Sequence, residues 1–207
     1  MKRFKVWLAI GSAALLSACA VSPRNQTPAR VYDFGLPSVQ SPENRWTGMV
    51  LEVRSPSWFE TLGIDYRLAY DDPLRLREYA DSRWAVNPGV LLAQRLRQSM
   101  GFAAVAGNSE AECLLRVELL EFSQVFDSPE SSRGVLQGEL VLFDGKRRRL
   151  AERQFLVERR AVTPDARGGV GALVLSASGL ADALSAWLSE LRTKNGAGFC
   201  QRQFGVK

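Results

Sequence analysis

Residues 170–191 read VGALVLSASGLADALSAWLSEL, and this stretch decides how the rest of the chain must fold. Its apolar residues recur at intervals of three and four, which predicts a helix with one apolar stripe. Trp187 lies close to that stripe, and the pattern leaves open whether it belongs to the core or to an interaction surface. The leucines that we expect to be buried against another layer are Leu173, Leu180, Leu184 and Leu191.

Runs that alternate apolar and polar residues supply the layer that this helix needs, because period two is typical of half-buried strands. In one run the apolar phase slips at Leu120, which predicts a β-bulge. Asp71-Asp72-Pro73 and Asp144-Gly145 each separate two runs and predict hairpin turns. The runs cover residues 49–54, 66–70, 74–77, 115–122, 136–142 and 150–162.

A second helix is predicted to begin after Asn87, a preferred N-cap residue, with Pro88 at its first position and Gly101 as its C-terminal cap. Strands on both sides of this helix and a closing helix indicate an α+β fold. We expect a single domain with a mixed or antiparallel β-sheet and two main helices packed on one face. The domain is assigned to residues 31–200, and residues 201–207 to a C-terminal tail.

The first nineteen residues have the pattern of a bacterial export signal. A basic start precedes an uncharged apolar run, residues 6–16, which is too short to span a bilayer. Leu-Ser-Ala-Cys at residues 16–19 has the form of a lipobox, in which cleavage leaves the cysteine as the first residue. We therefore expect a signal peptide of residues 1–18 and a Cys19 that carries a diacylglyceryl thioether, with a further acyl chain such as palmitate on its amine. The alternative is an ordinary cleaved signal beside a chance cysteine.

Residues 19–30 are polar and contain proline, as expected of a lipidated tether between the bilayer and the domain. No Asp follows Cys19 directly, so the expected location is the outer membrane, with the domain facing the periplasm. Beyond the signal we expect no second apolar segment near twenty residues. The lipid is then the only part in contact with the membrane.

The composition narrows the classes of function. The 207 residues include no histidine, which excludes Ser-His-Asp and Cys-His catalysis and most zinc sites. Three positive charges of the formal +5 lie in the signal, so the mature chain carries +2 and nucleic acid is not an expected partner. We expect no enzyme activity, no cofactor and no metal. A Ser-Lys or carboxylate hydrolase stays open as a class.

Two cysteines remain after Cys19 is assigned to lipid. In an oxidising periplasm Cys113 and Cys200 can form one disulfide that fixes the C-terminal end of the domain. The other interpretation is a buried Cys113 at the start of a strand and a free Cys200 thiol on a loose tail.

Three further motifs have a structural and a functional interpretation. Asp71 and Asp72 are either a polar turn or part of an acid–base or metal site. Gly168-Gly169-Val170-Gly171 is either a place of close packing or a phosphate-binding turn, although it lacks the third glycine of the dinucleotide pattern. Lys146-Arg147-Arg148-Arg149 is either a solvated hairpin tip or a contact for an acidic partner or a lipid headgroup.

The chain resembles the ABC-type transport auxiliary lipoprotein family, the group that contains the paraquat-inducible C lipoprotein. The resemblance rests on the order of soft patterns together with the lipobox, and it covers nearly the whole mature chain. These patterns are Tyr66–Tyr70, Tyr79–Ala85 with its Arg83-Trp84-Ala85, Leu91–Leu96, Leu115–Leu119, Phe122–Phe126 and the closing helix.

This resemblance implies a non-enzymatic accessory component of a lipid transport system. Such a system pairs a permease and an ATPase with a mammalian-cell-entry domain protein, which is the expected partner. Self-association of the lipoprotein is a further implication of the family, and the residue pattern itself does not address it. The alternative is a lipoprotein that activates a cell-wall synthase or assists lipopolysaccharide assembly, since either would use a similar anchor and domain.

Overall fold

The computed structural model describes residues 28–36, 46, 48–102, 112–196 and 199–200. The predicted signal, Cys19, residues 20–27 of the tether and the tail 201–207 lie outside these residues. Everything that follows concerns the described part of the chain.

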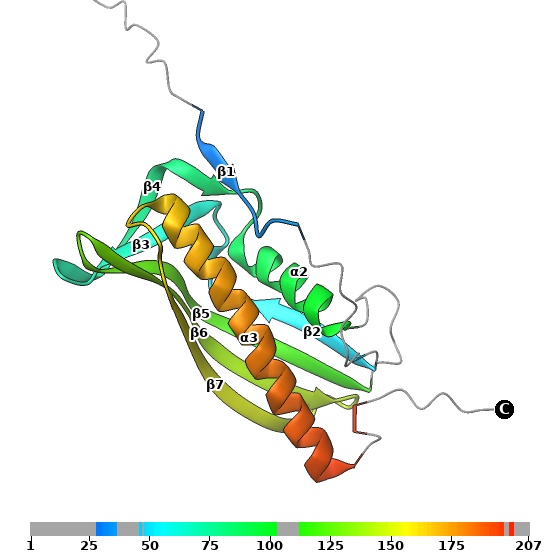
Figure 1. The fold of residues 1–207 in the computed structure, drawn as a ribbon. Coiled ribbons are helices and arrows are strands. Elements are labelled where there is room, and N and C mark those ends of the chain that lie inside the picture. Colours follow the sequence, from blue (N-terminus) through cyan, green and yellow to red (C-terminus); the bar gives the residue numbers. More distant parts are fainter. Residues whose placement is uncertain (1–27, 37–45, 47, 103–111, 197–198, 201–207) are drawn as a thin grey trace, which may run out of the picture.

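The described residues form one domain with a mixed sheet and two long helices, α2 and α3, on the same face of that sheet (Figure 1). This confirms the α+β fold and the placement of the helices. The elements in chain order are β1 (Arg30–Tyr32), β2 (Met49–Arg54), the 3-10 turn η2 (Ser57–Phe59), β3 (Gly63–Leu68), β4 (Asp72–Trp84), α2 (Pro88–Met100), β5 (Cys113–Ser128), β6 (Ser131–Asp144), β7 (Arg149–Arg160) and α3 (Ala166–Asn195).

The seven strands are arranged in the order β1-β4-β3-β5-β6-β7, and β2 also pairs with β5. Both β2 and β3 run parallel to β5 along the same edge, β2 beside residues 113–118 and β3 beside residues 124–126. They therefore act as one interrupted strand, and the chain leaves the sheet edge between Arg54 and Gly63. The hairpins β3–β4, β5–β6 and β6–β7 are antiparallel.

The predicted bulge is present in β5. Its pairing with β6 shifts between Leu119 and Glu121, so that Leu120 is the extra residue and is 56% exposed. Because side chains alternate across a strand, the extra residue returns the following apolar positions to the helix side. Leu119 before the shift and Phe122 after it are both buried in the core.

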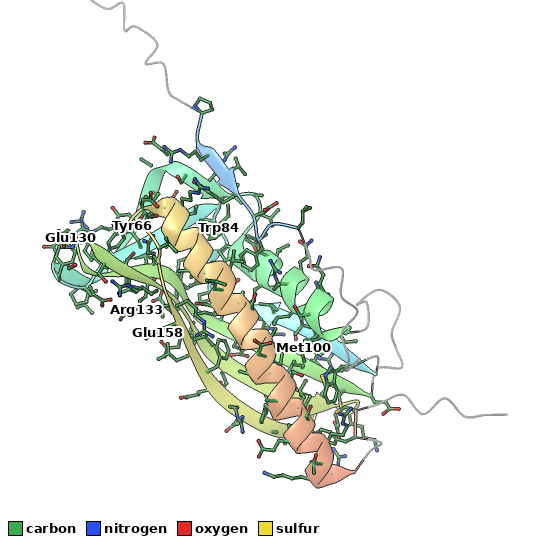
Figure 2. All side chains as sticks on the ribbon, in the orientation of Figure 1. Tyr66, Trp84, Met100, Glu130, Arg133 and Glu158 are labelled. Atoms are coloured by element: carbon green, nitrogen blue, oxygen red, sulfur yellow. A yellow bond between two sulfur atoms is a disulfide. The ribbon has the colours of Figure 1, made fainter. Side chains whose placement is uncertain are left out.

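Helix α2 has the ends that its sequence predicts. The Asn87 side chain accepts a hydrogen bond from the Val90 N–H at 3.0 Å, and Gly101 takes the left-handed conformation at φ 63°. Trp84, labelled in Figure 2 just before the helix, is fully buried. Its ring lies against those of Phe34 and Phe122. It packs the start of α2 against the sheet.

Helix α3 buries its apolar stripe on the sheet. Leu173, Leu180 and Leu184 are at most 1% exposed, and Leu191 at the last turns is half-buried. Trp187 is 3% exposed, which places it in the core, and the Arg153 guanidinium lies over its ring at 5.7 Å. Gly134 of β6 makes the close approach to α3 possible, because a Cβ there would come within 2.7 Å of the Leu173 nitrogen.

Several expected boundaries and one expected burial were wrong. Helix α3 begins at Ala166, two residues before the glycine motif at 168–171 that was expected to open it, because the Asp165 side chain accepts a hydrogen bond from the Gly168 N–H at 2.8 Å. Strand β6 begins at Ser131, before its apolar run, because it is aligned by β5. Leu74 is 89% exposed although it belongs to an alternating run, since that part of β4 lies next to the hairpin turn.

We expected no second apolar segment near twenty residues beyond the signal, and the composition of α3 shows that this expectation was wrong. One described helix, α3, is long and apolar enough to cross a membrane, with mean hydropathy 1.4 over its most apolar window. Half of that window is buried in the domain. The hydropathy is high because Ala and Leu also occur outside the stripe that contacts the sheet. Because half of the window is buried in the domain, α3 has the character of a core helix.

Replacing Leu184 with Ala should lower the free energy of unfolding by about 2–5 kcal/mol, through lost burial and the cavity left behind. Leu175 on the same helix is 54% exposed, so Leu175→Ala should change it by less than about 0.5 kcal/mol. Denaturant unfolding of both variants measures the difference. Equal effects of the two substitutions would contradict the packing of α3 described above.

Candidate functional site

A groove lies between the end of β2 and the N-terminal half of α2, at the place where the chain leaves the sheet edge. Its volume is about 510 Å³. One wall follows β2 and the turn to β3, and the other follows the first three turns of α2. The lining residues are Val53, Arg54, Ser55, Glu60, Asn87, Gly89, Val90, Ala93 and Arg97.

The two walls meet at Gly89 and Ser55. A Cβ at position 89 would lie 2.9 Å from the Ser55 hydroxyl oxygen, so glycine allows the loop to approach the helix this closely. Below this contact Phe59 of η2 is 1% exposed and anchors the loop in the protein. The buried Phe59 ring thus fixes the loop wall, and the close contact between Gly89 and Ser55 fixes that wall against the helix.

Arg54 and Arg97 give the groove its positive charge. Arg54 is engaged by Glu52, with its Nε 2.9 Å from the carboxylate. Arg97 donates one hydrogen bond to the Leu51 carbonyl at 3.3 Å, and its buried Nε has no hydrogen-bond partner. Among the described residues no carboxylate forms a salt bridge with Arg97.

The opposite face of the sheet, away from the helices, carries a ladder of charged pairs. Arg67 pairs with Glu121 at 3.0 Å, Arg116 with Glu52 at 2.9 Å, and Arg133 with Glu158 at 3.2 Å. Figure 2 shows Arg133 and Glu158 on neighbouring strands of this face. These pairs place charge on the outer surface of β5, β6 and β7, where Leu156 of β7 is also 58% exposed.

Asp65 lies within this outer face and is only 7% exposed. Burial first, and then the nearby Glu78 and Glu121 carboxylates, raise the pKa of Asp65 to about 7, against a smaller opposite effect of Arg67. Nothing in its sequence context distinguishes this aspartate, because the carboxylates that surround it come from β4 and β5. Within the described ranges no group of three acidic or cysteine side chains is arranged to hold a metal ion.

Cys113 and Cys200 are joined by a disulfide, with Cα atoms 5.3 Å apart and both residues 4% exposed. It links the first residue of β5 to the segment after α3, across 87 positions of sequence. The structure therefore has the bonded arrangement of the two that the sequence left open. Cys19 lies outside the described residues.

The acidic and glycine motifs have structural roles. Asp71 pairs with Arg77 at 2.6 Å, and Asp72 accepts a hydrogen bond from the Leu74 N–H at 3.1 Å, so they form a polar turn. Gly168 lies against the backbone at Thr163, and Gly169 lies against the Gln124 side chain. A Cβ at either position would collide with these neighbours, which is the close-packing interpretation.

The basic cluster forms the tip of the β6–β7 hairpin. Arg148 pairs with Asp144 at 2.7 Å and Arg149 with Glu152 at 2.5 Å. Asp144 also accepts the backbone N–H groups of Lys146 and Arg148 at 2.9 and 2.8 Å, and these bonds lower its pKa. Half of the cluster thus stabilises the turn, and all four cations are exposed.

Asp65→Asn should remove a pH dependence of stability. The folded chain holds a proton on Asp65 between pH about 4 and 7 that the unfolded chain has lost, so stability should fall as pH rises through this window. The wild-type chain should lose on the order of 2–4 kcal/mol more than Asp65→Asn between pH 5 and 8. Denaturant unfolding at both pH values measures this difference, with the exposed Asp182→Asn as control. Parallel profiles of wild type and Asp65→Asn would contradict it.

Protein made in the periplasm should contain no free thiol under denaturing conditions until a reductant is added, and two afterwards. Alkylation followed by mass analysis counts them, and a Cys19 sulfur in the predicted thioether would not be alkylated. Cys200→Ser should expose a single thiol and lower the free energy of unfolding by about 2–5 kcal/mol. Two reactive thiols in unreduced wild-type protein would contradict the bond.

No family model matches this chain, and no curated protein matches it. Among solved structures, a Xanthomonas campestris protein described as XCC0632 of the family DUF330 matches with a TM-score of 0.62 and 18% identity, over 82% of this chain and 97% of that one. An uncharacterised protein matches with a TM-score of 0.61 and 14% identity, over 78% of this chain and 99% of that one. At these identities the likeness shows a shared fold. That fold is consistent with the lipoprotein family that the sequence resembles.

Proposed function

We propose that this chain is an outer-membrane lipoprotein that serves as a non-catalytic accessory component of an ABC-type lipid transport system. Its partner in this proposal is a mammalian-cell-entry domain protein that bridges the periplasm. The observation that carries the proposal is the lipobox at Cys19, placed just before a domain with the fold of a DUF330 protein. The lipid would hold the domain at the membrane where a bridging protein ends.

The length of the tether supports this arrangement. Arg30, the first residue of β1, follows Cys19 by eleven positions, and a fully extended chain of that length reaches about 36–40 Å. The domain would therefore stay within one domain diameter of the bilayer. A partner that spans the periplasm would meet the domain at the membrane surface.

The residue types also favour a docking role over a catalytic one. The whole sequence lacks histidine, and the paired aspartates, the glycine motif and half of the basic cluster have structural partners. What the domain presents instead is a sheet face with several ion pairs, an exposed basic hairpin tip and a groove beside α2. These are features of a binding module.

The test combines an intact-mass measurement with co-purification of the tagged full-length chain from cross-linked membranes. The mass should show loss of residues 1–18 and added acyl chains, and the recovered partner should be a mammalian-cell-entry domain protein. Cys19→Ser should remain an unlipidated precursor or a soluble form and recover much less partner. A lipidated chain that recovers a cell-wall synthase or a lipopolysaccharide-assembly protein instead would replace this function by the alternative.

A further inference from the structure

Arg97 is a partly buried cation whose charge is not compensated inside the described domain. Its Nε is buried without an acceptor, and the guanidinium donates one long hydrogen bond, at 3.3 Å, to the Leu51 carbonyl. Burial of one guanidinium nitrogen without an acceptor costs free energy, and an anion in the groove would supply a counter-charge to the part of the guanidinium that lines it. Arg95, two positions earlier, differs because it donates to the Phe34 carbonyl and lies over the Phe34 ring.

The surroundings of Arg97 favour an anion in the groove. The first turn of α2 contains no acidic residue, so the positive end of the helix dipole opens on this side. Arg54 adds a second guanidinium, although Glu52 occupies it. Glu60 is the one carboxylate among the lining residues, and it is exposed to water, where its charge is screened.

The walls of the groove are in part apolar. Val53, Val90 and Ala93 line it beside the arginines, and Val90 is 50% exposed. A volume of about 510 Å³ is in the range of small-molecule sites and exceeds what a phosphate ion alone would fill. An anionic group attached to an apolar chain would satisfy both parts of the lining.

We infer that this groove binds the phosphate group of a glycerophospholipid, with Arg97 as the charge partner and Val53, Val90 and Ala93 in contact with the first methylenes of an acyl chain. The inference rests on the proposed function in one respect: the lipid anchor keeps the groove close to a phospholipid surface. A charge-assisted hydrogen bond from guanidinium to phosphate is the kind of contact that such a site would use.

Native mass spectrometry of the lipidated full-length chain in detergent can test this. The probes are phosphatidylglycerol, diacylglycerol with the same chains, and inorganic phosphate. The wild-type chain should retain one phosphatidylglycerol in preference to diacylglycerol, and Arg97→Gln should weaken retention about tenfold. Arg75→Gln, which removes an exposed positive charge on β4, should behave as wild type.

Val90→Asp is the second variant, because Val90 is exposed and its replacement should leave the thermal melting of the domain unchanged. It should also lose phosphatidylglycerol.

Retention that is unaffected in both Arg97→Gln and Val90→Asp, or equal retention of diacylglycerol, would overturn the inference. If inorganic phosphate at equal concentration displaces the lipid, the groove recognises free phosphate and the assignment to a lipid headgroup is wrong. None of these readouts involves the mammalian-cell-entry domain protein, so a failed co-purification would remove the proposed function and leave the groove result standing.

Discussion

The fold depends on how β5 keeps one apolar face along 16 residues while its neighbours change. The extra residue at Leu120 is the device that achieves this. Without it, Phe122 and Phe126 would point away from the helices, and the aromatic contacts among Phe34, Trp84 and Phe122 would be lost. The register shift therefore joins two half-sheets, one built with β2 and one built with β3, over a single core.

The same position explains where the groove lies. The parallel edge of β5 is covered by β2 up to Glu118 and by β3 from Gln124, so the intervening chain must leave the sheet and return. Residues 55–62 make that excursion, fixed by buried Phe59, while α2 enters above them. A break in a sheet edge exposes backbone and side-chain groups that regular pairing would satisfy. Arg97 of α2 donates to the Leu51 carbonyl of β2 and lines the groove that lies beside this break.

Local signals in the sequence were sufficient for elements whose cause is local. Asn87 and Gly101 define the ends of α2, Asp144-Gly145 defines a hairpin, and the phase slip at Leu120 defines the bulge. Asp65 and Arg97 could not be found in this way. Asp65 is buried near the carboxylates of β4 and β5, which raise its pKa. Arg97 lies against β2 without a carboxylate partner among the described residues. In both cases the neighbours come from other elements of the chain. A period-two or period-3.6 pattern reports which face a residue occupies, whereas the electrostatic environment is set by the strand that happens to be adjacent.

The attachment of the first strand would have a mechanical consequence if the chain is anchored by lipid at Cys19, as proposed. β1 pairs with β4 over only Arg30–Tyr32, and three ladder pairs at a sheet edge would open easily under load. Phe34, directly after the strand, is buried against Trp84 and Phe122, and Arg95 of α2 holds its carbonyl. If the chain is anchored at Cys19 as proposed, tension would open β1 first, and the buried Phe34 would then resist further unravelling. At the other end of the chain, the disulfide ties the segment after α3 to the first residue of β5, so both ends of the domain are fixed to the same central strand and its core.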